Sequence, residues 1–231
     1  MTVPVLMPTN VQNESFAGVV YHVQGELVPV LQVELQSTPV FFEHHVLLWK
    51  EPQVNIGAKS IAGGFKRAIA GLPIIMTVAE GPGTIAFSRD GPGHVFGLHL
   101  QTGHSVQVRE HQFLAATDNL EYSFERVKGV ANMLLGGSGF FVDTFTCKDT
   151  GGIVWLHGFG NVFEVVLRAG EAIDVEPAAW IYKDPSVRMD TNYQRLTAGF
   201  LGANAQIVTN RFTGPGRLGI QSMALHLPAA K

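Results

Sequence analysis

Cysteine is almost absent from this sequence, and charged residues are few. Cys147 is the single cysteine among 231 residues, so no disulfide can form within the chain, and a reducing compartment is the simplest setting. Charged residues make up 15% of the chain, against about 25% in an average globular protein. The formal net charge is −3, and the only adjacent basic pair is Lys66–Arg67. A nucleic acid is therefore disfavoured as a partner, because nucleic-acid binders gather basic residues into a patch or stripe.

Long apolar runs are also missing. The uncharged stretch 129–142 is short and interrupted by glycines, and the longer stretch 91–108 contains three histidines and a Gly-Pro-Gly turn. Neither reaches the roughly 20 apolar residues that a helix needs to cross a bilayer. The first residues have neither the basic start and apolar core of a secretory signal nor Arg/Ser-rich transit character. These absences predict a cytoplasmic protein with no integral membrane span.

What the sequence does contain is glycine, 26 residues in all, and many runs rich in Val, Phe and Thr, which indicate short strands and tight turns. These runs recur. The segment Val95–Gly103 aligns with Val162–Gly170 at an offset of 67 residues, and a third copy begins near Val33. Two turn motifs recur at a spacing of 133: Glu51-Pro-Gln-Val as Asp184-Pro-Ser-Val, and Gly-Pro-Gly at 81–83 as the same tripeptide at 214–216.

Internal similarity at a fixed period is typical of a repeated structural unit. We therefore predict an all-β chain of three tandem units of about 67 residues, like β-sandwiches or double-stranded β-helices, in a pseudo-threefold arrangement. The units share a core and form one compact domain. Their predicted bounds are an N-terminal arm and first strand at 1–27, unit 1 at 28–94, unit 2 at 95–161 and unit 3 at 162–228. Little helix is expected, and only in connectors such as 60–69 and 124–135.

Several of these motifs resemble a known family. The hairpin Leu167-Arg-Ala-Gly-Glu171, the following Val175-Glu-Pro177 and Asp184-Pro-Ser-Val187, and the Gly-Gly-Ser-Gly-Phe-Phe stretch at 136–141 resemble the altered-inheritance-of-mitochondria (AIM) family. The resemblance covers the chain after residue 15. It implies a threefold repeat within one chain and a fold similar to the trp RNA-binding attenuation protein. Mitochondrial members are linked to the inner membrane and its cristae, and the resemblance supplies no catalytic residue. The first unit departs from the pattern at 37–39 and 43–45, which puts any family surface there in doubt.

Metal and nucleophile chemistry find little support in the sequence. A cupin-like metal site needs two histidines one residue apart, and no His-x-His occurs. His44 and His45 are adjacent, so they would point to opposite faces of a strand. Cys147 has no basic neighbour except Lys148, and a lone cysteine is more often a small core residue than a nucleophile. No cofactor, metal or catalytic residue is predicted.

Two speculative sites remain. If the units surround a pseudo-threefold axis, the carboxylates Glu51, Asp118 and Asp184 could converge on one surface, although ordinary turn chemistry explains them better. A basic patch would gather the residues Lys66, Arg67, Arg126, Lys128 and Arg195 from the connectors.

The sequence predicts a non-enzymatic structural or interaction (scaffold) protein, acting near a membrane through partners. Self-association or a protein partner is expected, because exposed sheet edges must be covered or used. The alternative is a binding module for a small ligand or single-stranded RNA. A cupin-like metalloenzyme is the weakest alternative.

Overall fold

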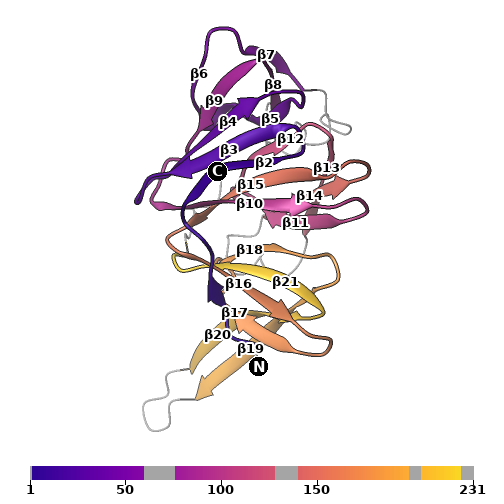
Figure 1. Cartoon of the computed structure of the whole chain (residues 1–231). Helices are drawn as coiled ribbons and strands as arrows, with labels where there is room; N and C mark the ends of the chain where they lie inside the picture. Colours follow the sequence, from indigo (N-terminus) through magenta and orange to yellow (C-terminus); the bar gives the residue numbers. More distant parts are fainter. Residues whose placement is uncertain (1, 60–75, 128–139, 198–203, 225–231) are drawn as a thin grey trace.

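Strands make up almost all of the regular structure. Figure 1 shows the chain as a computed structural model that describes residues 2–59, 76–127, 140–197 and 204–224. Within these ranges the only helical element is the single 3-10 turn η1 (His44–Val46). The all-β prediction is confirmed. The expected connector helix at 124–135 is wrong where it can be checked, because residues 124–127 lie in a strand; residues 60–69 and 128–135 lie outside the described residues.

After the N-terminal strands, the chain forms three successive sets of six strands. The N-terminal strands are β1 (Val5–Leu6), β2 (Val11–Phe16) and β3 (Val19–Gln24). The first set comprises β4 (Val30–Leu35), β5 (Val40–Glu43), β6 (Leu47–Lys50), β7 (Asn55–Ala58), β8 (Met76–Glu80) and β9 (Gly83–Phe87). The second set comprises β10 (Gly93–Leu100), β11 (Ser105–Arg109), β12 (Phe113–Thr117), β13 (Leu120–Val127), β14 (Phe140–Cys147) and β15 (Gly152–Phe159). The third set comprises β16 (Val162–Leu167), β17 (Ala172–Val175), β18 (Trp180–Lys183), β19 (Arg188–Thr197), β20 (Asn204–Thr213) and β21 (Gly216–Gln221).

Strand pairing follows the same scheme in all three sets, and every pair is antiparallel. The sixth strand pairs with the first and the third, as β9 does with β4 and β6, β15 with β10 and β12, and β21 with β16 and β18. The fifth strand pairs with the second and the fourth. Each set therefore consists of two groups of three strands, which belong to different sheets.

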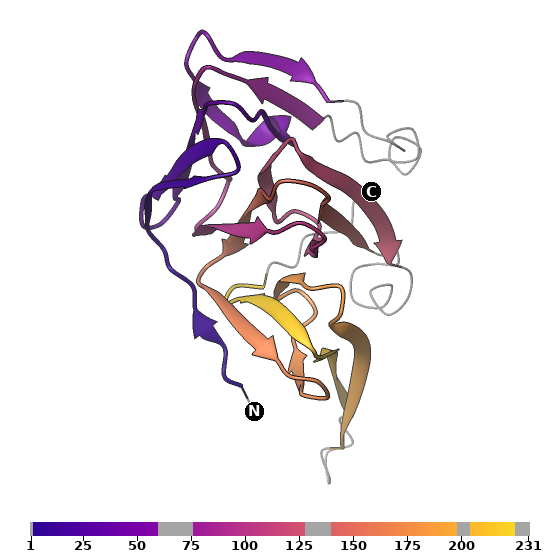
Figure 2. The same cartoon turned by 45° about the vertical axis from the view of Figure 1, so that its right-hand side comes forward.

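These groups assemble into four sheets. Their strand orders are β2-β3-β4-β9-β6, β10-β15-β12-β5-β8-β7, β1-β16-β21-β18-β11-β14-β13 and β17-β20-β19. Figures 1 and 2 show the first set at one end of the molecule, the second in the middle and the third at the other end. Three hydrophobic clusters hold the sheets together. The first contains residues of the five- and six-stranded sheets, the second of the six- and seven-stranded sheets, and the third of the seven- and three-stranded sheets.

A strand inside this stack is covered on both faces. All eight residues of β15 are buried, including Trp155, whose side chain is fully enclosed. Successive side chains of a strand point to opposite faces, so a strand between two cores reads as a continuous apolar run rather than as an alternation. This explains the Phe41-Phe42 pair in β5, in which both rings are fully buried.

The glycine turns predicted from the repeated tripeptide lie where two strands meet tightly. Gly83 begins β9 at φ +136°, and Gly216 begins β21 at φ +137°. Glycine adopts this left-handed region without a steric penalty, whereas other residues do not. The two copies of the tripeptide therefore have the same backbone conformation at their third residue.

Candidate functional site

A pocket of about 350 Å³ lies where the second and third sets of strands meet. It is lined by residues of β11, β13, β14, β18 and β19 together with the β18–β19 turn. The residues that define its chemistry are Gln107, Glu125, Val142, Trp180, Lys183 and Met189. The volume falls within the range of small-ligand sites, roughly 300–1,000 Å³.

Lys183 is the chemical centre of this pocket. Strand pairing sets Lys183 opposite Gln107, and the Lys183 ammonium donates to Gln107 Oε1 at 2.5 Å and to the Val187 carbonyl at 2.8 Å. The residue is only 9% exposed, and this burial lowers the pKa of Lys183, although Glu125 and Asp184 act in the opposite direction. Two of its three N–H groups are engaged, so the third could meet a ligand oxygen while the apolar wall packs against the ligand's body.

A second polar cluster surrounds Arg89, between the first and second sets. The Arg89 guanidinium donates to the Phe113 carbonyl at 2.9 Å. Burial, with the charge of Arg89 second, lowers the pKa of both His111 and His157 to about 4. At neutral pH these imidazoles are uncharged. His45 lies 3.5 Å from the buried Glu43 carboxylate.

This cluster is not arranged as a metal centre. Across the part of the chain that the structure describes, no three His, Cys, Asp or Glu side chains are placed to hold a metal ion together. No motif in the sequence indicates this cluster, because its members come from β5, η1, two loops and β15. No spacing rule joins these segments, which only strand pairing between the sets brings together.

Of the three carboxylates predicted from the repeat, two hold turns. Thr84 N–H donates to Glu51 Oε2 at 2.7 Å, and Arg217 N–H donates to Asp184 Oδ2 at 2.8 Å. Both carboxylates therefore stabilise the start of the strand that follows the Gly-Pro-Gly turn. The Asp184 carboxylate also accepts two bonds from the Arg217 side chain, at 3.2 and 3.0 Å.

The third carboxylate, Asp118, has a different environment. It forms an ion pair with Lys59, whose ammonium also lies 4.2 Å from the centre of the Phe41 ring. Among the described hydrogen bonds and ion pairs, none joins Glu51, Asp118 or Asp184 to another member of the trio. The structure brings these residues together through no described contact.

The predicted basic patch lies largely outside the described residues. Lys66, Arg67 and Lys128 lie outside the described residues. Arg126 lies in β13 and Arg195 in β19, so neither belongs to a connector, and their side chains are not among those described. RNA binding through this patch stays a prediction. Cys147 is fully buried in β14, as expected for a core cysteine.

The molecule is thus an all-β protein of stacked antiparallel sheets. The chain belongs to the family described as Mitochondrial biogenesis AIM24, whose model matches residues 21–223. The family resemblance seen in the sequence is confirmed. A search of curated proteins found no match. A structural-genomics crystal structure of a Streptococcus pyogenes protein is similar at a TM-score of 0.64 and 19% identity, covering 89% of this chain and 94% of that one. At this identity the similarity shows the fold alone.

The structure also addresses membrane insertion by helices. Over the described ranges, no helix has the length and apolarity required to cross a membrane.

Proposed function

We propose that this protein is a non-enzymatic interaction protein that binds protein partners through an open sheet edge. The observation that carries the proposal lies on β6, the end strand of the five-stranded sheet. Leu48 is 54% exposed there, and the following Trp49 is 41% exposed. Leu114 and Ile181 hold the same position in the third strands of the other two sets, and both are 0% exposed. An exposed apolar edge strand is a site for association.

Several of the side chains that could carry out chemistry are engaged in structural contacts, which is consistent with a non-enzymatic role. Glu51 and Asp184 bind backbone amides, and Cys147 is enclosed in the core. Charged side chains that hold turns and strand junctions serve the architecture, and the recurring set of six strands supports three structural units at 28–94, 95–161 and 162–228. Residues 1–27 add three strands to the first and third units.

A photo-crosslinking amino acid placed at position 48 in cells tests the proposal. The expected result is a covalent adduct with a protein. The matched control is position 166, where the natural valine is 52% exposed but lies on β16, which is paired with a neighbour on each side. Equal labelling at both positions, or none at position 48, would contradict a binding role for β6.

A second candidate function is small-ligand binding, which the pocket around Lys183 favours. A buried ammonium beside Trp180 and Val142 suits a small amphipathic molecule with an acceptor group. Native mass spectrometry of gently purified protein is the test. Reproducible added mass on the wild type that is lost in Lys183→Met would support this role, and bare protein in both samples would contradict it.

We further propose that the protein resides in a reducing compartment and associates with membranes only indirectly. The single cysteine supports a reducing compartment such as the cytoplasm, while the printed family description refers to mitochondrial biogenesis. A scaffold of this kind would reach a membrane only through its partners. Cell fractionation with an alkaline carbonate wash tests this, because a partner-held protein is released by the wash whereas an inserted one is retained.

A further inference from the structure

Both internal sheets of the molecule are built by joining two groups of three strands. In the six-stranded sheet, β7-β8-β5 of the first set continues into β12-β15-β10 of the second. In the seven-stranded sheet, β13-β14-β11 of the second set continues into β18-β21-β16 of the third. In each case the second strand of one set pairs with the third strand of the next set.

The two junctions have the same register. At the first, Ala115 lies opposite Phe42 and Ala116 opposite Phe41. At the second, Tyr182 lies opposite Val108 and Lys183 opposite Gln107. In both third strands these residues follow an irregularity in the pairing with the sixth strand. The junction is therefore one interface used twice within the chain.

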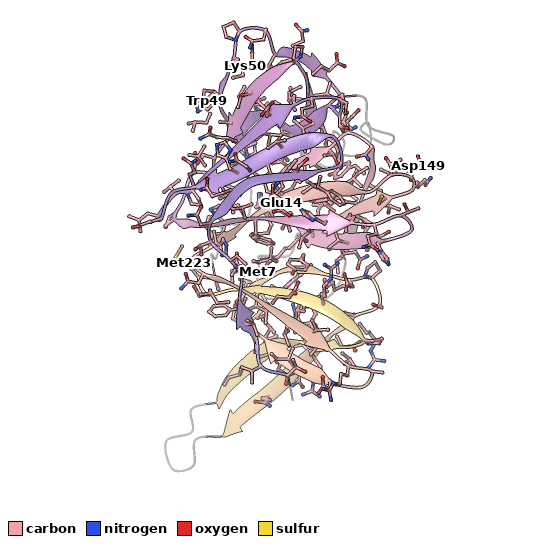
Figure 3. The ribbon with its side chains drawn as sticks, in the orientation of Figure 1. Met7, Glu14, Trp49, Lys50, Asp149 and Met223 are labelled. Carbon is pink, nitrogen blue, oxygen red and sulfur yellow. The ribbon has the colours of Figure 1, made fainter. Side chains whose placement is uncertain are left out.

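Two groups of strands are left without this junction. They are β6-β9-β4 of the first set and β17-β20-β19 of the third, and in the described residues no strand pairs with the outer edge of β6 or β17. Figure 1 shows β6 and β17 toward opposite ends of the molecule, and Figure 3 shows Trp49 and Lys50 at the β6 end. The unused edges are a third strand and a second strand, which are the two halves of the internal junction.

β6 has the same local features as the third strands at the two internal junctions. β6 has the same irregularity in its pairing with β9, between Leu47 and Trp49. Trp49 therefore corresponds to Ala115 and Tyr182, which lie at the internal junctions and are both fully buried. Trp49, by contrast, is 41% exposed, and among the described residues β6 has a strand on one side only, whereas β12 and β18 have one on each side.

We propose that the missing strand comes from a second copy of this chain, with β6 of one copy pairing antiparallel with β17 of the next. This rests on the proposed function, of which it names the partner. The internal register places Trp49 opposite Val175 and Lys50 opposite Asp174 of the next copy. The Lys50–Asp174 pair has opposite charges and stands where Lys183 meets Gln107 inside the chain.

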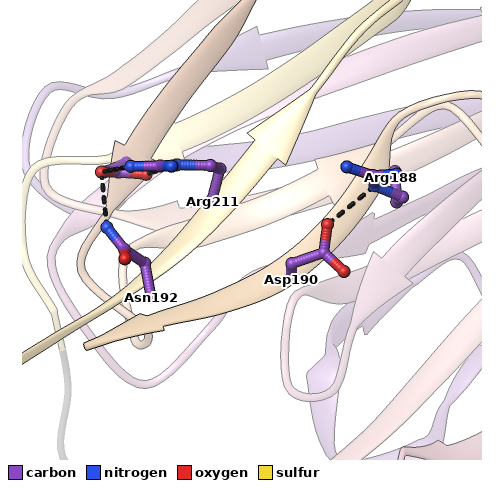
Figure 4. Close-up of polar contacts among 5 residues, drawn as sticks. Arg188, Asp190, Asn192 and Arg211 are labelled. Atoms are coloured by element: carbon purple, nitrogen blue, oxygen red, sulfur yellow. Dashed lines mark hydrogen bonds and ion pairs between the residues drawn. The ribbon is translucent and has the colours of Figure 1, made fainter.

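The Asp174 carboxylate is oriented by contacts within its own sheet. The Arg211 guanidinium donates to both of its carboxylate oxygens at 2.7 Å, and Asn192 donates to one at 3.0 Å. Figure 4 shows these contacts beside the Arg188–Asp190 ion pair. A carboxylate has about four acceptor positions, so it can also accept a bond from an incoming ammonium.

Such a contact is heterologous, because β6 and β17 are different surfaces. Each added copy brings a new free β6 or a new free β17, so the assembly closes into a ring or continues as a filament. The stack of sheets then continues from one copy into the next, with β17-β20-β19 and β6-β9-β4 completing a sheet between them.

Charge exchange at the predicted contact is the sharpest test. The wild type should give masses at several multiples of 25.0 kDa in native mass spectrometry and light scattering, rising with concentration. Lys50→Asp alone and Asp174→Lys alone should each stay predominantly monomeric, because each places like charges opposite one another. Mixing the two variants, or combining both changes in one chain, should restore assembly. Asp190→Lys, an exposed change on β19 at the other edge of the same three-stranded sheet, should assemble as the wild type does.

Folding is checked by the melting temperature of each variant. Should Asp174→Lys fail to fold, the photo-crosslinker at position 48 of the purified wild-type protein decides, with the expected adduct on β17 or β20 of another copy. A wild type that stays at 25.0 kDa at every concentration overturns the inference. So does assembly that both charge variants leave unchanged. An adduct at position 48 with a different protein in cells would then still support the proposed function.

Discussion

Phe41 and Phe42 are neighbours in the chain, yet their side chains lie in two different hydrophobic cores. The Phe41 ring packs in the second cluster near Phe113 and Phe145, whereas the Phe42 ring lies in the first cluster, 4.8 Å from the centre of the Phe87 ring. β5 therefore joins two cores through one strand, because successive side chains leave opposite faces of a sheet.

This arrangement predicts additive effects. Phe41→Leu and Phe42→Leu should each lower the free energy of unfolding by about 1 kcal/mol, since each removes part of a fully buried ring. The double variant should equal the sum within about 0.5 kcal/mol, measured by urea unfolding. Phe113→Leu with Phe145→Leu is the control, because those rings lie 4.9 Å apart in one core and should be coupled. Strong coupling between Phe41 and Phe42 would contradict the separation of the cores.

Neutralising either of the two turn carboxylates, Glu51 or Asp184, should lower the stability of the protein by a similar amount. Glu51→Gln and Asp184→Asn keep the shape of the side chain but remove the charge that accepts the Thr84 and Arg217 amides. Each should reduce the free energy of unfolding by about 1–2 kcal/mol, because hydrogen bonds to charged groups contribute more than neutral ones. Glu26→Gln, in the exposed β3–β4 loop, should change it little. Thermal unfolding of the three variants makes the comparison, and equal melting temperatures would show that the two carboxylates do not stabilise the strands that follow the turns.

Two glycines of the third set should differ in their tolerance of a methyl group. A Cβ at Gly219 would overlap the buried Tyr182 ring, whereas a Cβ at Gly170 meets open space, although φ is +79° there. Gly219→Ala should therefore lower the free energy of unfolding more, by about 1–3 kcal/mol or above, because the added methyl group overpacks the core. Gly170→Ala should cost about 1 kcal/mol of backbone strain. The reverse order of melting temperatures would show that the β18–β21 contact is looser than described.

The buried histidines predict acid sensitivity. An unfolded histidine takes up its proton near pH 6.5, whereas His157 in the folded protein does so only near pH 4. The unfolded state therefore binds more protons in this window, and the free energy of unfolding falls as the pH falls from 6.5 to 4. The loss from His157 would be up to about 3 kcal/mol at pH 4.

His157→Gln isolates this effect. The variant should lose less stability than the wild type between pH 6.5 and 4 in urea titrations, whatever its stability at pH 7. The exposed His104, changed to Gln, should leave the pH dependence as it is. An unchanged slope in His157→Gln would mean that other groups, with His111 the first candidate, carry the acid response.

Local patterns made much of the strand content predictable. The alternating residues of 163–167 form β16, and the apolar runs after the three glycine turns begin β9, β15 and β21. The helix expected from residue 124 failed because Phe124 to Val127 pair with β14, and that long-range pairing outweighs local preference. The three tandem units and their pseudo-threefold arrangement stay predictions.

The candidate sites were harder to predict, for a physical reason. Lys183 becomes a buried pocket residue only because β18 pairs with β11, and His157 approaches Arg89 only across two sheets. Sequence spacing contains no information on pairing between strands that lie 70 residues or more apart. The carboxylates at the turns were visible because their whole environment is the turn and the strand that it starts.

The division of each six-strand set between two sheets limits how the length of such a chain can change during evolution. Cutting the chain between two sets would divide an internal sheet and expose the edges of the second and third strands that pair there. A change in length that keeps the internal sheets intact therefore adds or removes a whole set, because only then does the second strand of each set still pair with the third strand of the set that follows it. The β5–β12 and β11–β18 pairs thus make the complete set of six strands, rather than the single strand, the unit by which the chain can grow or shrink.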